Sequence, residues 1–227
     1  MRWLRPLSLA LAVLALVLLA LSGPGTRFEL WSYRIGFGVF AWAAYLGLGA
    51  ALVAVLALAL PGSRRGGVAV SAVALVLGLA VFYVPLQFQR AARAVPPIND
   101  ISTDTERPPQ FMTVTHPYPG VVFARQQHAA YPHLAAAKLP LPPAEAFRRA
   151  LSAAEAMGWE VVGSDAASGR IEAVDTTPWF GFKDDIAIRV EPADGASRID
   201  VRSRSRVGRS DLGINARRIR TYLERLK

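Results

Sequence analysis

Three long apolar runs, none with a charged residue in its central portion, occupy most of the first 90 residues. A helix of about 20 apolar residues crosses the hydrocarbon core of a bilayer, and a charge at its centre costs at least about 2.5 kcal/mol. The sequence therefore predicts three transmembrane helices, over about residues 7–21, 35–60 and 68–86. The first run is short, but Trp3 and Leu4 extend it, and the guanidinium of Arg5 can reach the interface.

The first run also has the basic start and apolar centre of a secretory signal peptide. Its nearest approach to a cleavage site is a loose small-residue pattern at Ala20–Ser22. Cleavage would leave the rest of the chain on the same side of the membrane, so the predicted location does not depend on it.

Arginines at the helix ends predict the orientation, because loops rich in Lys and Arg stay in the cytoplasm. The amino terminus and the turn at residues 61–67 carry four arginines, whereas the opposite ends carry four that Glu29 partly offsets. This weak bias favours a cytoplasmic amino terminus and, after three crossings, a domain outside the cytoplasm. The two sets are Arg2, Arg5, Arg64 and Arg65, and Arg27, Arg34, Arg90 and Arg93.

The net charge of +9 is spread unevenly along the chain. Residues 1–90 contain seven arginines and one acid, whereas residues 91–227 contain 19 of the 26 basic and 16 of the 17 acidic residues. Much of the excess therefore flanks membrane helices, and no nucleic-acid partner is expected. The chain has no cysteine, which excludes disulfides, thiolate catalysis and cysteine-bound zinc.

The composition changes near residue 90, so we expect an anchor over residues 1–90, an extended proline-rich linker over 91–119 and a soluble domain over 120–227. The linker either stays free or drapes along the domain, held by Phe111. Hydrophobic periodicity then predicts the elements of the domain. They are a short strand at Val121–Arg125, a helix at 143–157, strands at 159–165, 170–176, 185–191 and 198–207, and a last helix at about 212–226.

Short turns between the last four strands force a meander, and both helices must then cover its apolar face. The predicted fold is an α+β domain with an antiparallel sheet of four to five strands and two helices, helix-grip-like, with a ferredoxin-like sandwich as the alternative.

Several stretches of the domain resemble a known family, domain of unknown function 1499. The resemblance covers about residues 95–227 and implies a membrane-anchored bacterial member, with no established activity and no catalytic residues. The location is then the bacterial inner (plasma) membrane, multi-pass, with the amino terminus cytoplasmic and the domain periplasmic. The matching stretches are Pro97–Phe111, Met157–Val162, Gly169–Asp185 and Arg198–Ile219.

Residues able to carry catalysis are few. His116, His128 and His133 lack the spacing of a helical metal pair, so no metal or cofactor is expected. Asp184 and Asp185 are adjacent, and neighbouring side chains of a strand point to opposite faces, which makes a poor acid–base pair. The sequence favours a non-enzymatic protein without settling the question.

The best candidate site is basic, because residues 197–227 contain ten basic and three acidic residues. The last strand and the start of the last helix would form an anion- or partner-binding surface, since a helix amino terminus favours anions. Two alternatives remain open: the arginines pair with carboxylates across the sheet, or the Asp211 carboxylate caps the helix itself. The candidate residues are Arg202, Arg204, Arg206, Gly208, Arg209, Ser210, Asn215 and Arg218.

These features favour a membrane-anchored envelope protein that binds a partner protein or an anionic ligand such as a lipid headgroup, besides the lipid bilayer itself. One alternative is an enzyme that modifies an envelope lipid or glycan. Another is a small transport or assembly accessory protein, although no acidic residue, lysine or histidine lies at membrane depth in the predicted helices.

Overall fold

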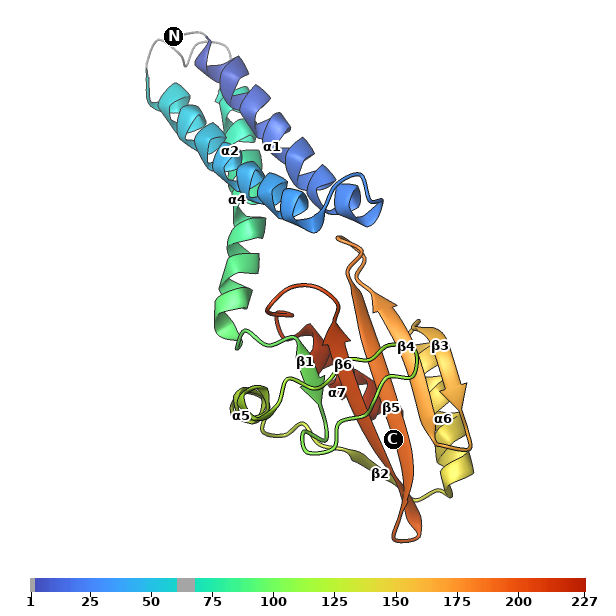
Figure 1. Cartoon of the computed structure of the whole chain (residues 1–227). Helices are drawn as coiled ribbons and strands as arrows, with labels where there is room; N and C mark the ends of the chain where they lie inside the picture. The colour runs from blue at the N-terminus through green and yellow to red at the C-terminus, as the bar shows by residue number, and fades with distance from the viewer. Residues whose placement is uncertain (1–2, 61–67) are drawn as a thin grey trace. The chain divides into compact units, whose positions relative to one another are not determined.

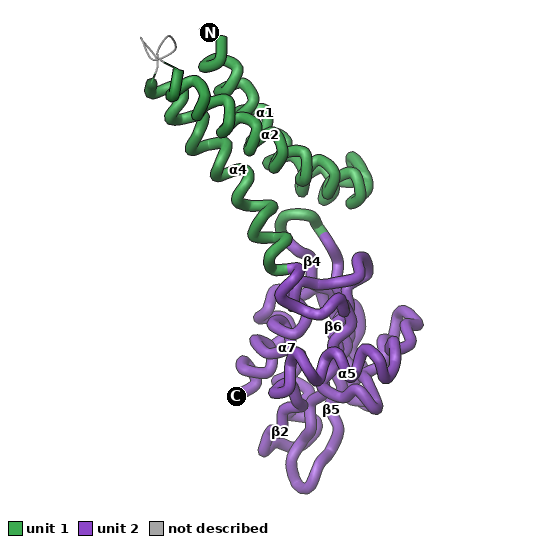
Figure 2. The backbone as a smooth tube through the Cα atoms, turned by 90° about the vertical axis from the view of Figure 1, so that its left-hand side faces the viewer, with its two compact units in different colours: residues 1–91, 178–181 green, residues 92–177, 182–227 purple. Residues whose placement is uncertain are grey.

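The computed structural model describes residues 3–60 and 68–227, which form two compact units (Figure 2). The first unit comprises residues 1–91 together with 178–181, and the second comprises residues 92–177 and 182–227. The expected basic turn at residues 61–67 and Arg2 lie outside the described residues.

Three long apolar helices make up nearly all of the first unit, and each is long and apolar enough to cross a membrane (Figure 1). This confirms the three predicted helices, although each begins earlier or ends later than its apolar run because charged and polar residues continue the helix at its ends. The helices are α1 (Leu4–Arg27), α2 (Tyr33–Ala59) and α4 (Val68–Ala94).

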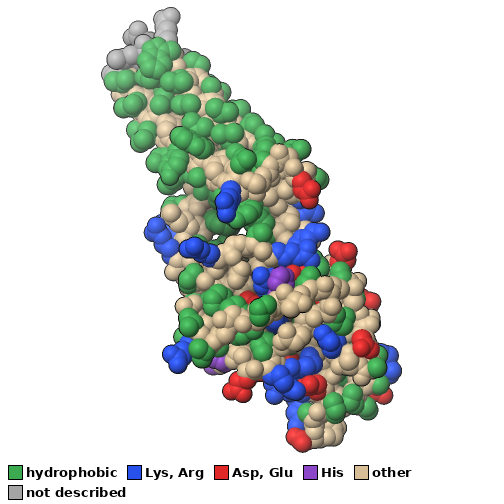
Figure 3. All heavy atoms as spheres, viewed as in Figure 1, with side chains coloured by type: hydrophobic (Ala, Val, Ile, Leu, Met, Phe, Trp, Pro, Cys, Tyr) green, Lys and Arg blue, Asp and Glu red, His purple; other side chains and the backbone are tan. Residues whose placement is uncertain are grey.

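Small residues bring these helices together. A methyl group on Gly47 would lie 2.8 Å from the carbonyl oxygen of Gly78, so α2 and α4 touch backbone to backbone there. Ala12, Ala50 and Ala74 are fully buried where the three helices meet. Large apolar side chains point outward instead, and Figure 3 shows them covering the visible face of the helices. This arrangement is typical of helices that pack together in lipid.

The four residues 178–181 complete the first unit. The ring of Phe180 lies 5.0 Å from that of Phe37, and Arg27 donates a hydrogen bond of 2.9 Å to the carbonyl of Pro178. Gly23 leaves the space that the Trp179 indole fills, since a Cβ there would lie 1.9 Å from it. These four residues therefore depend on the anchor helices for their packing.

The second unit is a six-stranded antiparallel sheet with helices on one face (Figure 1). Strands follow the order β1-β6-β5-β4-β3, and β2 also pairs with β6. This meander confirms the α+β class, whereas a ferredoxin-like sandwich would interleave its strands. The elements are β1 (Asp100–Ser102), α5 (Val121–Ala130), β2 (Ala137–Leu139), α6 (Pro143–Ala156), β3 (Glu160–Asp165), β4 (Arg170–Thr176), β5 (Lys183–Ala193), β6 (Ala196–Ser205) and α7 (Ile214–Arg225).

Alternation along the strands gives the sheet one apolar and one polar face. The apolar face carries Ile188 and Val201, paired across β5 and β6, and packs against α6 and α7. Tyr222 of α7 is fully buried there, stacked on Trp159, and donates a 2.8 Å hydrogen bond to the carbonyl of Ala150 in α6.

Residues 103–119, here called the strap, cross the polar face of the sheet without forming a helix or strand (Figure 1). The side chain of Phe111 is buried beneath them. Of the two alternatives for this region, the structure therefore shows the draped one.

The predicted strand at Val121–Arg125 is wrong, because these residues form the first half of α5. The edge of β6 that such a strand would need is already taken by β1 and β2. The Gln-Gln-His-Ala-Ala run that follows is also compatible with a helix. Gln127 of α5 instead binds the free edge of β1: it accepts from the N–H of Ser102 at 2.9 Å and donates to its carbonyl at 2.7 Å.

Candidate functional site

The predicted site residues do not form one surface, because the sheet separates them. Arg202, Arg204 and Arg206 lie on the polar face, whereas Asn215 and Arg218 reach the apolar face from α7. The loop at residues 206–213 joins the two groups.

Arg202 is fully buried and already paired. Its guanidinium binds both carboxylate oxygens of Asp100 on β1, at 2.9 and 2.7 Å. It also lies over the rings of Phe111 and Tyr118, 4.8 and 5.5 Å from their centroids. Burial and the charge of Asp100 raise the pKa of Tyr118 to about 12. Arg202 is thus part of the interior and is closed to an outside anion.

The next two arginines along the strand are more open. Arg206 binds Asp185 through two nitrogens, with a shortest distance of 2.7 Å, while its side chain stays 43% exposed. Arg204 lies 3.8 Å from Asp100, which Arg202 already engages, and its side chain is 24% exposed. Both therefore face a carboxylate that partly neutralises them.

On the other face, Arg218 and Asn215 are the centre of a buried polar network. Arg218 donates to Asp184 at 2.6 Å and to Asp175 at 2.8 Å. Asn215 accepts from the hydroxyl of Ser203 at 2.7 Å. A buried arginine needs such partners, since removing one leaves an unpaired charge in the interior. These contacts make α7 part of the domain core.

The amino terminus of α7 is occupied by the chain itself. The Asp211 carboxylate accepts from the N–H groups of Gly213 and Asn215, both at 2.8 Å. Burial raises the pKa of Asp211, although these two N–H donors act against that shift. Gly208 accepts from the side chain of Asn99, and Ser210 accepts from the N–H of Leu212. The structure thus shows both open alternatives: Asp211 caps the helix, and arginines of the strand pair with carboxylates.

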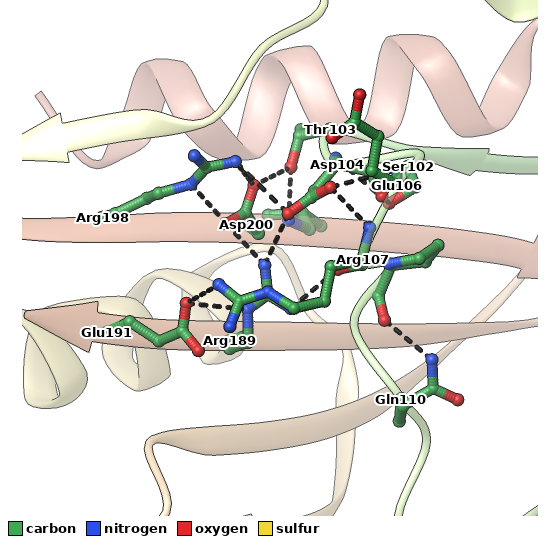
Figure 4. Close-up of polar contacts among 12 residues, drawn as sticks. Ser102, Thr103, Asp104, Glu106, Arg107, Gln110, Arg189, Glu191, Arg198 and Asp200 are labelled. Carbon is green, nitrogen blue, oxygen red and sulfur yellow. Dashed lines mark hydrogen bonds and ion pairs between the residues drawn. The ribbon is translucent and has the colours of Figure 1, made fainter. Parts of the chain in front are cut away.

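A second ionic network on the polar face was not among the predicted site residues (Figure 4). Arg189 of β5 binds Asp104 of the strap at 2.9 Å and Asp200 of β6 at 3.0 Å. Arg198 binds the same two carboxylates, at 3.4 and 2.7 Å. Burial acts to raise the pKa of Asp104, but the N–H of Arg107 and the guanidinium of Arg189 outweigh it and hold that pKa below its ordinary value.

The sequence held only part of the signal for this network. The alternation of Arg198, Asp200 and Arg202 indicates a charged face on the last strand of the sheet. Asp104 lies in a polar, turn-rich segment about 90 residues away, and nothing in its surroundings indicates a partner. Only the path of the strap brings it to Arg189.

The residues considered for catalysis lie apart. Asp184 binds Arg218 on one face of the sheet, and Asp185 binds Arg206 on the other, as expected for neighbours in a strand. His128 of α5 contacts Thr105, whereas His116 lies edge-on to Phe111 within the strap. Among residues 3–60 and 68–227, no three histidine, aspartate or glutamate side chains are grouped to hold a metal ion.

Four exposed arginines lie on α7 and the loop before it. Arg209, Arg217, Arg220 and Arg225 are all exposed, and Glu224 is the one acid of α7. Within the described residues, none of these four arginines forms an ion pair. This surface therefore leaves positive charge for an outside ligand.

Comparison with known protein families gives a match. The family model described as "Protein of unknown function (DUF1499)" matches residues 100–226, which include the sheet, the strap and helices α5 to α7. No curated protein matches the chain.

Proposed function

Because the chain belongs to the DUF1499 family, whose description assigns no activity, we propose its function from the geometry. We propose a membrane-tethered, non-enzymatic domain that binds anionic lipid headgroups through exposed arginines of α7 and the loop before it. The observation that carries this proposal is the unpaired state of Arg209, Arg217 and Arg220, beside interior arginines that are paired.

The tether supports a lipid ligand. Helix α4 ends at Ala94 and β1 begins at Asp100, so few residues separate the anchor from the domain. Tethering raises the effective concentration of a ligand held on the same membrane, so weak contacts suffice. Each arginine near an anionic surface contributes about 1 kcal/mol, and salt screens this attraction.

Energy transfer in nanodiscs tests the lipid ligand. The chain lacks cysteine, so Thr221→Cys on the exposed side of α7 gives one labelling site. We expect energy transfer from this label to acceptor-labelled headgroups to rise when phosphatidylglycerol replaces 30% of the phosphatidylcholine, a composition chosen for this test, and to fall again in high salt.

Paired variants provide the control. Arg217→Glu with Arg220→Glu should abolish the response to phosphatidylglycerol. Arg148→Glu with Arg149→Glu, the same charge change on the exposed side of α6, should preserve it. An equal response in both variants, or no response in the unmodified chain, would exclude the proposal.

We further propose that the anchor lies in the bacterial inner membrane with the domain in the periplasm. The arginine bias of the helix ends and the three apolar helices among residues 3–60 and 68–227 support this orientation. A reporter fused after Lys227 should be active in the periplasm. Activity confined to the cytoplasm would reverse the proposed orientation without affecting the lipid-binding test.

A further inference from the structure

The sheet binds the main chain of the strap at several positions. Three arginines of the sheet donate hydrogen bonds to carbonyl oxygens along it: Arg170 of β4, Arg189 of β5 and Arg202 of β6. The acceptors and distances are Arg107 at 2.7 Å from Arg189, Pro109 at 3.4 Å and His116 at 3.1 Å from Arg202, and Gln110 at 3.4 Å and Phe111 at 3.2 Å from Arg170.

A glutamate of the sheet binds N–H groups of the same main chain, whereas the three arginines bind its carbonyl oxygens. Glu172 of β4 is buried and accepts from the N–H groups of Met112 and Thr113, the latter at 2.8 Å. Acceptors and donors of the strap are thus both matched by side chains of the sheet. Since every residue except proline carries both groups, these main-chain contacts suit an extended polypeptide and do not themselves depend on its side chains.

Among the strap side chains that contact this face, Asp104 and Phe111 meet its arginines. Asp104 binds Arg189 and Arg198, and Phe111 is buried against the guanidinium of Arg202. They lie seven residues apart, with Pro108 and Pro109 keeping the chain between them extended. The pattern that the face selects is therefore an acidic residue and an aromatic residue at this spacing.

Few apolar contacts hold the strap in place. Pro108, Pro109 and Phe111 are its buried side chains, while the sheet beneath it presents the buried charges of Glu172, Asp200 and Arg202. Segments with few buried apolar contacts open at a lower free energy than the core. Once the strap opens, those charges need water or another main chain as a partner.

We propose that the strap is a displaceable occupant of a polypeptide-binding face, and that an extended segment of a partner protein binds there in its place. The partner segment carries an acidic and an aromatic residue seven positions apart. This face is on the side of the sheet away from α7, so the proposal is independent of lipid binding. The closed strap lowers the apparent affinity for the partner in proportion to the fraction of molecules that are open.

A synthetic strap peptide tests the proposal on the full chain in nanodiscs. The probe is a fluorescent peptide of residues 103–119, and the variant is Phe111→Ala, which weakens the strap and leaves the sheet side chains in place. We expect the peptide to bind this variant at least tenfold more tightly than it binds the unmodified chain. A peptide with both Asp104→Ala and Phe111→Ala should lose this binding.

One control variant and one check of folding make the peptide result decisive. Val162→Ala, which removes an exposed apolar side chain from β3, should bind the peptide as weakly as the unmodified chain. A folded Phe111→Ala variant, judged by circular dichroism, that gains no affinity for the peptide overturns the proposal.

Hydrogen exchange on the unmodified chain decides the question if Phe111→Ala fails to fold. We expect the amides of Met112 and Thr113 to exchange at least 100-fold faster than those of Ile186 and Ile188 in β5. Equal rates would mean that the strap opens only when the whole domain unfolds, and would overturn the proposal.

Discussion

At the residue scale, Asp100 is what allows Arg202 to be fully buried. Removing one partner of a buried ion pair costs about 3–5 kcal/mol, because the other charge is left without compensation. We therefore expect Asp100→Ala to lower the free energy of unfolding by that amount. The measurement is chemical denaturation of the protein in detergent, followed by a signal from the second unit.

The matched control is a surface ion pair of the same domain. Arg107 pairs with Glu191, and the Arg107 side chain is 66% exposed. Arg107→Gln should cost about 0–1 kcal/mol. A similar loss in the two variants would show that Asp100 and Arg202 do not act as a buried pair.

Asp104 makes the strap sensitive to acid. Its pKa is lower in the folded chain than in the unfolded chain, so its stabilising contribution is present above the unfolded value of about 3.9 and is lost as the pH falls through the folded value. Asp104→Asn should therefore flatten the fall in stability below about pH 4. Denaturation midpoints measured across this range test the prediction, and parallel curves for the two proteins would contradict it.

At the element scale, a side chain of α5 acts as the neighbour that β1 lacks. Gln127 is buried and engages both the N–H and the carbonyl of Ser102. Each buried main-chain group left without a partner costs about 1–3 kcal/mol. We expect Gln127→Ala to reduce stability by at least this amount and to speed hydrogen exchange at Ser102. Gln126→Ala, an exposed neighbour, should change neither.

The elements themselves were largely predictable from the sequence. Alternation in Ile186, Ile188 and Val190 marks a strand with one buried face, and the stripe around Ala216 and Ile219 marks α7. The prediction for Val121–Arg125 failed because a run of four apolar residues does not distinguish a strand from a helix turn. The partner strand that would have decided the matter is a distant part of the chain.

The site was less predictable than the fold, for the same reason. The basic strand–helix unit was recognised from its charge, but the carboxylates that pair with it come from elsewhere in the sequence. Asp100 is about 100 residues from Arg202, and Asp184 is 34 residues from Arg218. Local sequence patterns therefore predict where the arginines lie, but they do not predict whether the arginines are paired with carboxylates.

At the scale of the whole molecule, the two units have separate cores, so damage to one should remain local. Gly47→Leu places a side chain where the backbones of α2 and α4 touch, whereas a Cβ at Gly49 of the same helix would meet no atom within 4 Å, which makes Gly49→Leu the control. Packing clashes of this kind cost about 1–3 kcal/mol or more. We expect faster hydrogen exchange in the membrane helices of the Gly47 variant only, with exchange in β5 unchanged. Faster exchange in β5 would show that the units unfold together.

The pairing of Gln127 with β1 has a consequence for how many copies one membrane can hold. Proteins confined to a membrane are crowded together. An unpaired strand edge can pair with the edge strand of a neighbouring copy, so that copies add one after another. The opposite edge strand, β3, is broken by a bulge between Val161 and Gly163. Gln127 thus binds the outer edge of β1 at Ser102, and the bulge interrupts β3, so these two strands are poor templates for the edge strand of a neighbouring copy.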